Sequence, residues 1–435
     1  MNEHKNIDII TLGCSKNLVD SERLMGRLEA AGFHCTHDAE HPCGQIAVIN
    51  TCGFIGDAKE ESINTILQFA ARKTDGQLER LYVMGCLSER YLHDLETEIP
   101  EVDRWFGKFN FMDLLDELGV PAQSEQRHLT TPKHYAYVKI SEGCNRMCSY
   151  CAIPLITGRH TSRPMEDILD EVKRMQAQGV KEVNVIAQDL SSYGLDLYHE
   201  HKLAELIDRM ADIAGIEWIR LHYAYPTDFP EDVLDVMARR ANVCKYLDIA
   251  LQHSTDHMLS LMRRHITAAD QDALIRRIRE RVPGICIRTT LLVGHPGETE
   301  DDFQALKQWV KEMRFDRMGA FAYSDEEGTY ANLHYNDDIP DEVKQRRVDE
   351  LMAIQQEISG ELMAQKTGTI QRIIIDAEEG DYYVGRTEYD SPEVDCNVLI
   401  DKHATDAACT IGAFYNVKKT KAEEFDLFGK LWNKN

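Results

Sequence analysis

Three closely spaced cysteines are the strongest chemical feature of the sequence. Cys144, Cys148 and Cys151 form a C-x3-C-x2-C pattern directly after Gly143. Three thiolates at this spacing can bind three irons of a cubane 4Fe-4S cluster, which normally takes four cysteines. A bacterial ferredoxin would instead use C-x2-C-x2-C with a fourth cysteine, and structural zinc would need paired cysteines or histidines. The pattern therefore predicts a cluster with one iron left open to a ligand that is not protein.

Three further cysteines each follow a strand-like run, and they are Cys14, Cys52 and Cys86. The runs before them are 7–12, 46–50 and 81–84. In a parallel sheet the carboxyl ends of the strands meet at one edge, where α/β proteins bind ligands. One such cysteine alone would more often be a small buried side chain, but three on one edge predict a second cluster site. The other cysteines have no partner spacing and are interpreted as structural.

The elements around these cysteines predict a multidomain α/β protein. Residues 1–125 alternate strands with helices, as in a parallel α/β sheet domain. Residues 132–365 contain about six strand–helix units, which predicts a partial (β/α)6 barrel with its site at the carboxyl ends of the strands. The strands expected there are 137–140, 183–188, 218–223, 246–251, 287–293 and 319–323. Residues 366–435 alternate as short strands between turns and predict a small antiparallel β-barrel.

The charge of the chain bears on its partners. The 435 residues carry a formal net charge of −25. Proteins that hold nucleic acids through phosphate contacts have basic surfaces, so this balance disfavours a nucleic-acid substrate and favours a basic protein. No apolar run approaches the ~20 residues of a membrane span, and no secretion signal is visible. We therefore expect a cytoplasmic protein with no membrane partner.

The motifs around both cysteine groups resemble those of the radical S-adenosylmethionine (SAM) methylthiotransferases. The C-x3-C-x2-C pattern with Tyr150 before its last cysteine is similar to their radical-SAM motif. The contexts Thr11-Leu12-Gly13-Cys14, Asn50-Thr51-Cys52 and Gly85-Cys86-Leu87 are similar to their N-terminal cysteine motifs. That family has an N-terminal cluster domain, a radical-SAM partial barrel and a C-terminal, OB-like TRAM domain. This resemblance covers nearly the whole chain.

The context of the first cysteine resembles one branch of that family. It reads Gly13-Cys14-Ser15-Lys16-Asn17, which looks like the branch that acts on an aspartate of ribosomal protein uS12. The branch that acts on transfer RNA adenosine typically reads G-C-Q-M-N there. Gly385-Arg386-Thr387 near the C-terminus also looks like the uS12 branch.

This resemblance implies β-methylthiolation of that aspartate with two 4Fe-4S clusters and SAM. Cys144, Cys148 and Cys151 would hold the cluster that reduces SAM to a 5′-deoxyadenosyl radical. The auxiliary cluster, on Cys14, Cys52 and Cys86, would present the sulfur. Replacing an unactivated C–H bond is beyond acid–base side chains, so we expect no catalytic residue besides the cluster ligands. A reductant and a sulfur source are also implied.

Four other residues are predicted to contact cofactor or substrate. Tyr150 would pack against the adenine of SAM or shield the cluster. Gln188, Asp189 and Arg288 lie within or at the ends of expected barrel strands and would contact SAM or substrate.

Two other functions remain open from the sequence. The first is a transfer RNA adenosine methylthiotransferase, against which the charge and the Cys14 context argue. TRAM domains usually bind RNA, but acidic side chains outnumber basic ones from Lys366 onward, so an RNA contact is not favoured. The second is a non-catalytic iron–sulfur electron carrier, for which the barrel and the last domain would be superfluous.

Overall fold

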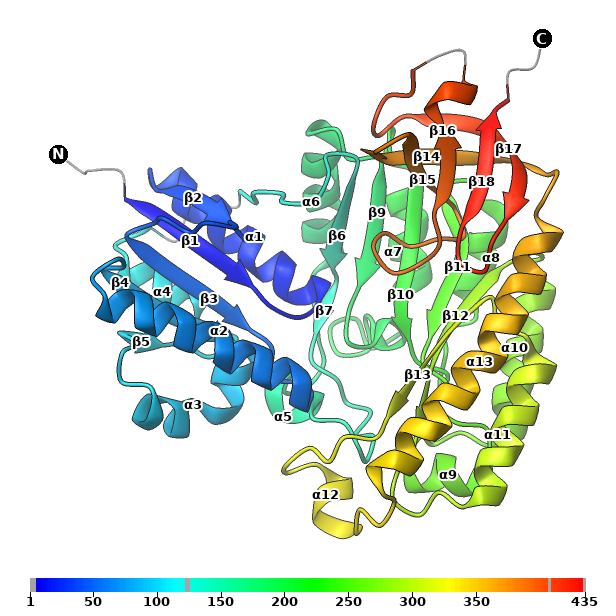
Figure 1. The fold of residues 1–435 in the computed structure, drawn as a ribbon, viewed down its shortest axis with the longest axis horizontal. Helices are drawn as coiled ribbons and strands as arrows, with labels where there is room; N and C mark the ends of the chain where they lie inside the picture. The colour runs from blue at the N-terminus through cyan, green and yellow to red at the C-terminus, as the bar shows by residue number, and fades with distance from the viewer. Residues whose placement is uncertain (1–4, 122–125, 406–407, 433–435) are drawn as a thin grey trace.

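The computed structural model describes residues 5–121, 126–405 and 408–432. Figure 1 shows an N-terminal module beside a central barrel, with a small C-terminal barrel over one end of the central one. The described part of the chain contains no helix long and apolar enough to cross a membrane.

The N-terminal module is a five-stranded parallel sheet in the order β2-β1-β3-β4-β5. Its elements are β1 (Asn6–Thr11), α1 (Ser15–Ala30), β2 (His34–His37), β3 (Ile46–Thr51), α2 (Gly56–Thr74), β4 (Arg80–Gly85), α3 (Cys86–Glu98), β5 (Arg104–Trp105) and α4 (Phe111–Glu117). Alternate residues of β3 pack on opposite faces, Val48 against α1 and α4 and Ile49 against α2 and α3. Because both faces are covered, the central strands are apolar almost throughout.

The central module is a six-stranded parallel sheet in the order β6-β9-β10-β11-β12-β13, curved into an open barrel. Its strands are β6 (Tyr135–Lys139), β9 (Glu182–Ile186), β10 (Trp218–Ala224), β11 (Val243–Ile249), β12 (Cys286–Val293) and β13 (Arg317–Ala322). Its helices are α5 (Ile153–Thr157), α6 (Met165–Ala177), η1 (Leu190–Ser192), α7 (Leu203–Ala211), α8 (Asp232–Arg239), α9 (Asp256–Leu261), α10 (Ala268–Arg281), α11 (Glu300–Met313), α12 (Tyr330–His334) and α13 (Asp341–Gln365).

The two faces of the central sheet differ in polarity. Val183 and Val185 of β9 belong to the apolar core outside the barrel. Since side chains alternate along a strand, Glu182 and Asn184 face the interior. The barrel interior is therefore polar, which suits a site rather than a packed core.

The C-terminal module is a closed barrel in the order β14-β15-β16-β18-β17. Its elements are β14 (Ile370–Glu379), β15 (Tyr382–Thr387), β16 (Val398–Asp401), η2 (Lys402–Ala404), β17 (Phe414–Ala422) and β18 (Leu427–Leu431). Four strand pairs are antiparallel, as expected, whereas β16 pairs with β18 in parallel.

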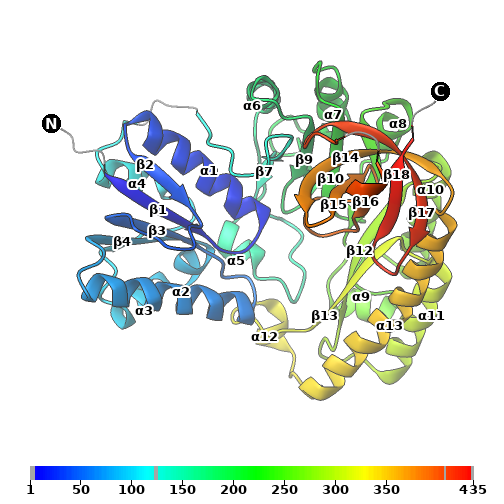
Figure 2. The same cartoon turned by 45° about the horizontal axis from the view of Figure 1, so that its top comes forward.

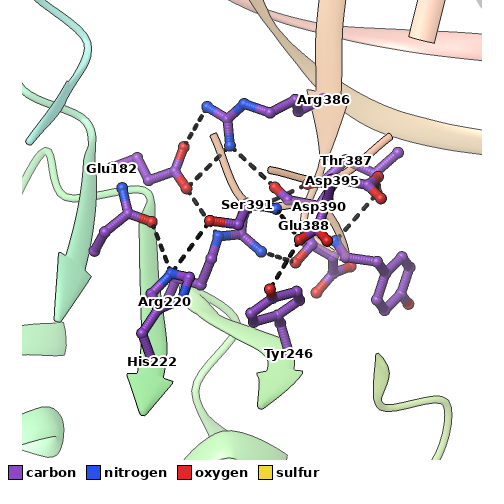
Figure 3. Close-up of polar contacts among 12 residues, drawn as sticks. Glu182, Arg220, His222, Tyr246, Arg386, Thr387, Glu388, Asp390, Ser391 and Asp395 are labelled. Atoms are coloured by element: carbon purple, nitrogen blue, oxygen red, sulfur yellow. Dashed lines mark hydrogen bonds and ion pairs between the residues drawn. The ribbon is translucent and has the colours of Figure 1, made fainter. Parts of the chain in front are cut away.

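The C-terminal module covers the amino ends of the central strands (Figure 2). Arg386 donates to Glu182, the first residue of β9, at 2.8 Å between Nη2 and Oε2. Arg317, the first residue of β13, donates to Asp390 at 2.6 Å. Figure 3 shows Glu182, Arg386 and Asp390 close together between the two modules. The carboxyl ends of the central strands remain on the opposite side, facing the N-terminal module.

Candidate functional site

The loop that carries Cys144, Cys148 and Cys151 is closed at its base by a two-stranded hairpin. Strand β7 (Ser141–Glu142) pairs antiparallel with β8 (Thr161–Ser162). The N–H of Cys144 donates to the carbonyl of Gly158 at 3.2 Å. Gly143 has φ +76°, and a Cβ there would lie 2.1 Å from the carbonyl oxygen of Arg159. The two ends of the loop therefore approach more closely than any side chain at position 143 permits.

A buried arginine lies against this cysteine loop. The side chain of Arg264 is 2% exposed. Its Nη1 is 3.2 Å from both Cys148 Sγ and the Tyr150 hydroxyl, and its guanidinium stacks 4.0 Å from the ring centroid of Tyr225. The Tyr225 hydroxyl is itself 3.5 Å from Cys148 Sγ. A fixed positive charge beside a sulfur stabilises the thiolate form that binds iron.

Two of the loop thiols, Cys144 and Cys151, are poor acids. Burial raises the pKa of Cys144 to about 12, although the backbone N–H of Arg146 opposes it. Burial and the neighbouring Cys148 also raise the pKa of Cys151. Binding of a metal to these thiols would therefore displace their protons, as metal binding to cysteine generally does.

The second cysteine group lies at the carboxyl edge of the N-terminal sheet. Cys14, Cys52 and Cys86 follow β1, β3 and β4, which are neighbours in the sheet. A Cβ on Gly13 would lie 2.9 Å from Cys52 Sγ, and a Cβ on Gly53 would lie 2.7 Å from the backbone N of the residue after Cys86. The three cysteine loops are therefore packed directly against one another.

Asn17 ties these three loops together. Its amide Nδ2 donates to the carbonyls of Leu12, at 2.9 Å, and Thr51, at 3.0 Å. Its Oδ1 accepts from Cys86 Sγ at 3.7 Å. One buried side chain thus fixes the spacing of the strand ends that carry the cysteines.

The cysteines of this group differ in acidity. Burial opposes ionisation of Cys14, but the Lys16 ammonium and the backbone N–H groups of Asn17 and Lys16 together lower its pKa. Cys14 precedes α1, so the positive helix end contributes to this effect. Burial raises the pKa of Cys86 to about 12. Burial also raises the pKa of Cys52, so Cys14 is the most readily ionised member of the group.

Among the described residues, no three His, Cys, Asp or Glu side chains are grouped so as to hold one metal ion. In a cubane each cysteine binds a different iron, so the sulfurs must stand further apart than the ligands of one zinc.

The two cysteine groups face the same junction between the N-terminal module and the barrel. Helix α3, which begins at Cys86, packs against α5, which follows Cys151. Across the junction, Lys108 lies 3.3 Å from Asp20 and 3.8 Å from Glu142. Lys139 of the barrel also pairs with both carboxylates. Charged contacts therefore hold the two groups at a common interface.

The four other predicted site residues lie around the junction in different settings. Gln188 donates to Glu142 at 3.0 Å, and its Oε1 is buried without a donor in the described chain. Arg288 lies between Asp248, at 3.4 Å, and Asp395, at 3.7 Å. Tyr150 is half-buried and packs in an apolar group with Leu292.

The carboxylate of Asp189 is already used within the protein. It accepts from Arg146 Nε at 2.7 Å, from the Ser191 N–H at 2.9 Å and from the Ser192 hydroxyl at 2.6 Å. Asp189 thus anchors the cysteine loop through Arg146.

Sequence reasoning missed three residues that contact the cysteine groups. Arg264 acts on a cysteine far away in the sequence, and no spacing signals this. Asn17 and Lys16 stand beside Cys14 and could have been found as polar residues that begin a helix directly after a ligand.

Comparison with known proteins identifies the chain. Residues 138–310 match the radical SAM superfamily, 6–107 match "Uncharacterized protein family UPF0004", and 367–431 match the TRAM domain. The ribosomal protein uS12 methylthiotransferase RimO of Bacteroides thetaiotaomicron is 63% identical over 99% of this chain and 99% of its own. The chain belongs to the RimO family. The RimO of Christiangramia forsetii is 53% identical over 98% of this chain and 94% of its own.

Solved structures show the same fold at low identity. The radical SAM methyltransferase TsrM from Kitasatospora setae has a TM-score of 0.54 at 17% identity, over 74% of this chain and 75% of its own. The cobalamin-dependent radical SAM enzyme OxsB has a TM-score of 0.53 at 12% identity, over 81% of this chain and 56% of its own. The resemblance to radical-SAM methylthiotransferases and the predicted fold class are confirmed. The radical-SAM family match implies a 4Fe-4S cluster and SAM.

Proposed function

We propose that the chain is a radical-SAM methylthiotransferase that modifies the β-carbon of an aspartate in ribosomal protein uS12. This proposal rests on the similarity to RimO proteins over the full length of the chain, at 63% identity to one of them. The two cysteine groups at one junction support it. A ribosomal protein is basic, which suits a chain with a net charge of −25. Such a substrate also places the reaction in the cytoplasm.

We assign Cys144, Cys148 and Cys151 to the cluster that binds SAM and Cys14, Cys52 and Cys86 to an auxiliary 4Fe-4S cluster. When bound, the clusters and SAM would supply the radical and the sulfur that side chains cannot. The chain's own residues hold this machinery in place. Arg264 donates to Cys148 Sγ, and Asn17 fixes the loops of the other group.

The remaining predicted residues take distinct roles in this proposal. Tyr150 shields the proposed cluster from solvent or packs against the adenine of SAM. Gln188 offers its unpartnered Oε1 to SAM or substrate, and Arg288 lines the barrel interior between two carboxylates. Asp189 acts indirectly, because Arg146 and two serines occupy its oxygens.

We place the domain boundaries at 1–125, 132–365 and 366–435. The family matches at 6–107, 138–310 and 367–431 support this division, as do the three separate sheets. The first boundary falls at residue 125, which lies outside the described residues. We expect no RNA contact through Arg386, because that side chain is 2% exposed and turned toward the barrel.

The test is an anaerobic assay with SAM, sulfide and a reductant, run in parallel on uS12 and on bulk transfer RNA. We expect the mass of a methylthio group on uS12 alone. A gain on transfer RNA alone would show that the substrate assignment is wrong. If neither 5′-deoxyadenosine nor product forms from reduced, reconstituted protein, the assignment as an enzyme is wrong.

A further inference from the structure

Lys16 is a buried cation at the junction without an anionic partner. It lies two residues after Cys14 in the first turn of α1 and is only 9% exposed. Its Nζ stands 3.3 Å from the ring centroid of Tyr223, at the carboxyl end of β10. Within the described chain it makes neither an ion pair nor a hydrogen bond to an acceptor.

The other basic side chains around the junction differ from Lys16 in this respect. Lys108 and Lys139 share Asp20 and Glu142. Arg146 pairs with Asp189, and Arg288 lies between Asp248 and Asp395. Each of these side chains has a carboxylate within ion-pair distance, whereas Lys16 has none in the described part of the chain.

The position of Lys16 links the auxiliary cysteines with the barrel. Its ammonium helps to lower the pKa of Cys14. On the barrel side, burial raises the pKa of Asp248 of β11, and the charges of Arg288 and Lys16 oppose that rise. Lys16 thus lies close to the proposed sulfur site on one side and to the barrel interior on the other.

A buried ammonium with only an aromatic partner is incompletely compensated. A cation–π contact contributes about 0.5–2 kcal/mol, while burying a charge without a counter-ion costs several kcal/mol. An incoming carboxylate would remove this deficit through a charge-assisted hydrogen bond. A neutral nucleobase would leave the ammonium unpaired.

We propose that Lys16 binds the side-chain carboxylate of the aspartate to be modified. This inference rests on the proposed function and names the residue that selects an aspartate. The carboxyl carbon is bonded to the carbon that receives sulfur. Anchoring the carboxylate beside Cys14 therefore presents that carbon to the auxiliary site.

The test compares uS12 carrying aspartate at the modified position with uS12 carrying asparagine there. Wild-type enzyme should prefer aspartate in kcat/KM by at least about tenfold, because asparagine leaves the buried ammonium unpaired. In Lys16→Met this preference should fall close to one. Lys16→Arg should keep most of it, because the charge remains. Lys173→Met, which removes an exposed lysine paired with Asp170, should leave the ratio at the wild-type value.

The ratio separates substrate binding from a merely structural role. If Lys16 had only a structural role, Lys16→Met would lower kcat/KM equally for both forms of uS12. An unchanged preference for aspartate in this variant would therefore overturn the inference. Iron content and SAM cleavage are measured on the same preparations. If Lys16→Met fails to hold iron, Lys16→Gln and Lys16→Arg are compared instead. A preference for aspartate that falls in Lys16→Gln but not in Lys16→Arg supports the inference. The same preference in both variants overturns it. Wild-type enzyme that modifies neither form of uS12 would overturn the proposed function itself.

Discussion

Gly143 shows how one residue decides whether the cysteine loop can close. Its φ of +76° is in the left-handed region that favours glycine, and a Cβ would meet the Arg159 carbonyl at 2.1 Å. Gly143→Ala should therefore open the β7–β8 base and lower the iron that reconstituted protein retains on the C-x3-C-x2-C loop by at least half.

Gly284 supplies the matched control for this prediction. Its φ of +78° is nearly the same, but a Cβ there meets nothing within 4 Å. Gly284→Ala should cost only the backbone preference, about 1 kcal/mol, and leave iron content unchanged. Equal iron loss in both variants would mean that backbone strain, and not loop closure, is responsible.

Arg264 should affect the reduction potential of the cluster that we assign to Cys148. Replacing it with leucine removes a positive charge and a hydrogen bond 3.2 Å from the Cys148 sulfur. Less positive charge near a cluster makes it harder to reduce, so the reduction potential in an EPR-monitored titration should fall. Arg264→Lys should fall less. An unchanged potential in Arg264→Leu would show that the arginine serves packing alone.

Single residues also show which contacts the sequence could predict and which it could not. The grouping of Cys14, Cys52 and Cys86 at one sheet edge followed from strand patterns and is seen in the structure. Arg264 was not predicted, because its partner Cys148 is distant in sequence. The contact of Lys16 with Tyr223 was not predicted for the same reason. No local pattern records a contact of that kind.

At the scale of elements, regular strands were predictable and very short ones were not. All six central strands lie at or within a few residues of the expected ranges. Strands β5, β7 and β8 have two residues each, too few for an alternating pattern. The parallel pairing of β18 with β16 was not expected in an antiparallel barrel, because it depends on segments distant in sequence.

The docking of β15 on β9 depends on a buried ion network. Glu182 is 0% exposed and bonds both Arg386, at 2.8 Å, and Arg220, at 3.0 Å. Glu182→Gln should lower the free energy of unfolding by about 3–5 kcal/mol, because buried Arg220 loses its carboxylate partner and Arg386 keeps only Asp376. Glu217→Gln, which removes an exposed pair with Arg372 between the same modules, should cost less than about 1 kcal/mol. Urea unfolding of both variants checks this; equal losses would contradict the network's role.

The same carboxylate predicts a pH dependence of stability. Burial alone would raise the pKa of Glu182, but Arg386 and Arg220 hold it below its ordinary value of 4.5. A lowered folded-state pKa contributes stability above that ordinary value and loses it as the pH falls through the folded value. Unfolding free energy should therefore drop below pH 4.5 in the wild type. In Glu182→Gln the drop should be shallower; an identical slope would remove Glu182 as its cause.

At the scale of the whole molecule, a buried ion cluster joins the N-terminal module to the central barrel. Glu326, after β13, is 2% exposed and pairs with Lys59 of α2 and Arg90 of α3, each at 2.8 Å. Glu326→Gln should loosen the N-terminal module and reduce methylthio product per 5′-deoxyadenosine severalfold, while SAM cleavage itself persists. Glu361→Gln, which removes an exposed pair with Arg314, should keep the wild-type amount of methylthio product per 5′-deoxyadenosine. If the amount of methylthio product per 5′-deoxyadenosine is unchanged in Glu326→Gln, the Glu326 ion pairs do not position the N-terminal module for the reaction.

The central claim is that one cysteine group serves SAM cleavage and the other serves sulfur insertion. One variant tests this claim most directly. In Cys14→Ala/Cys52→Ala/Cys86→Ala protein, iron, 5′-deoxyadenosine and the mass of uS12 are measured in parallel after anaerobic turnover. We predict that iron falls from about eight to about four per chain, that 5′-deoxyadenosine still forms, and that uS12 gains no methylthio group. Methylthiolated uS12 from this variant would contradict the account.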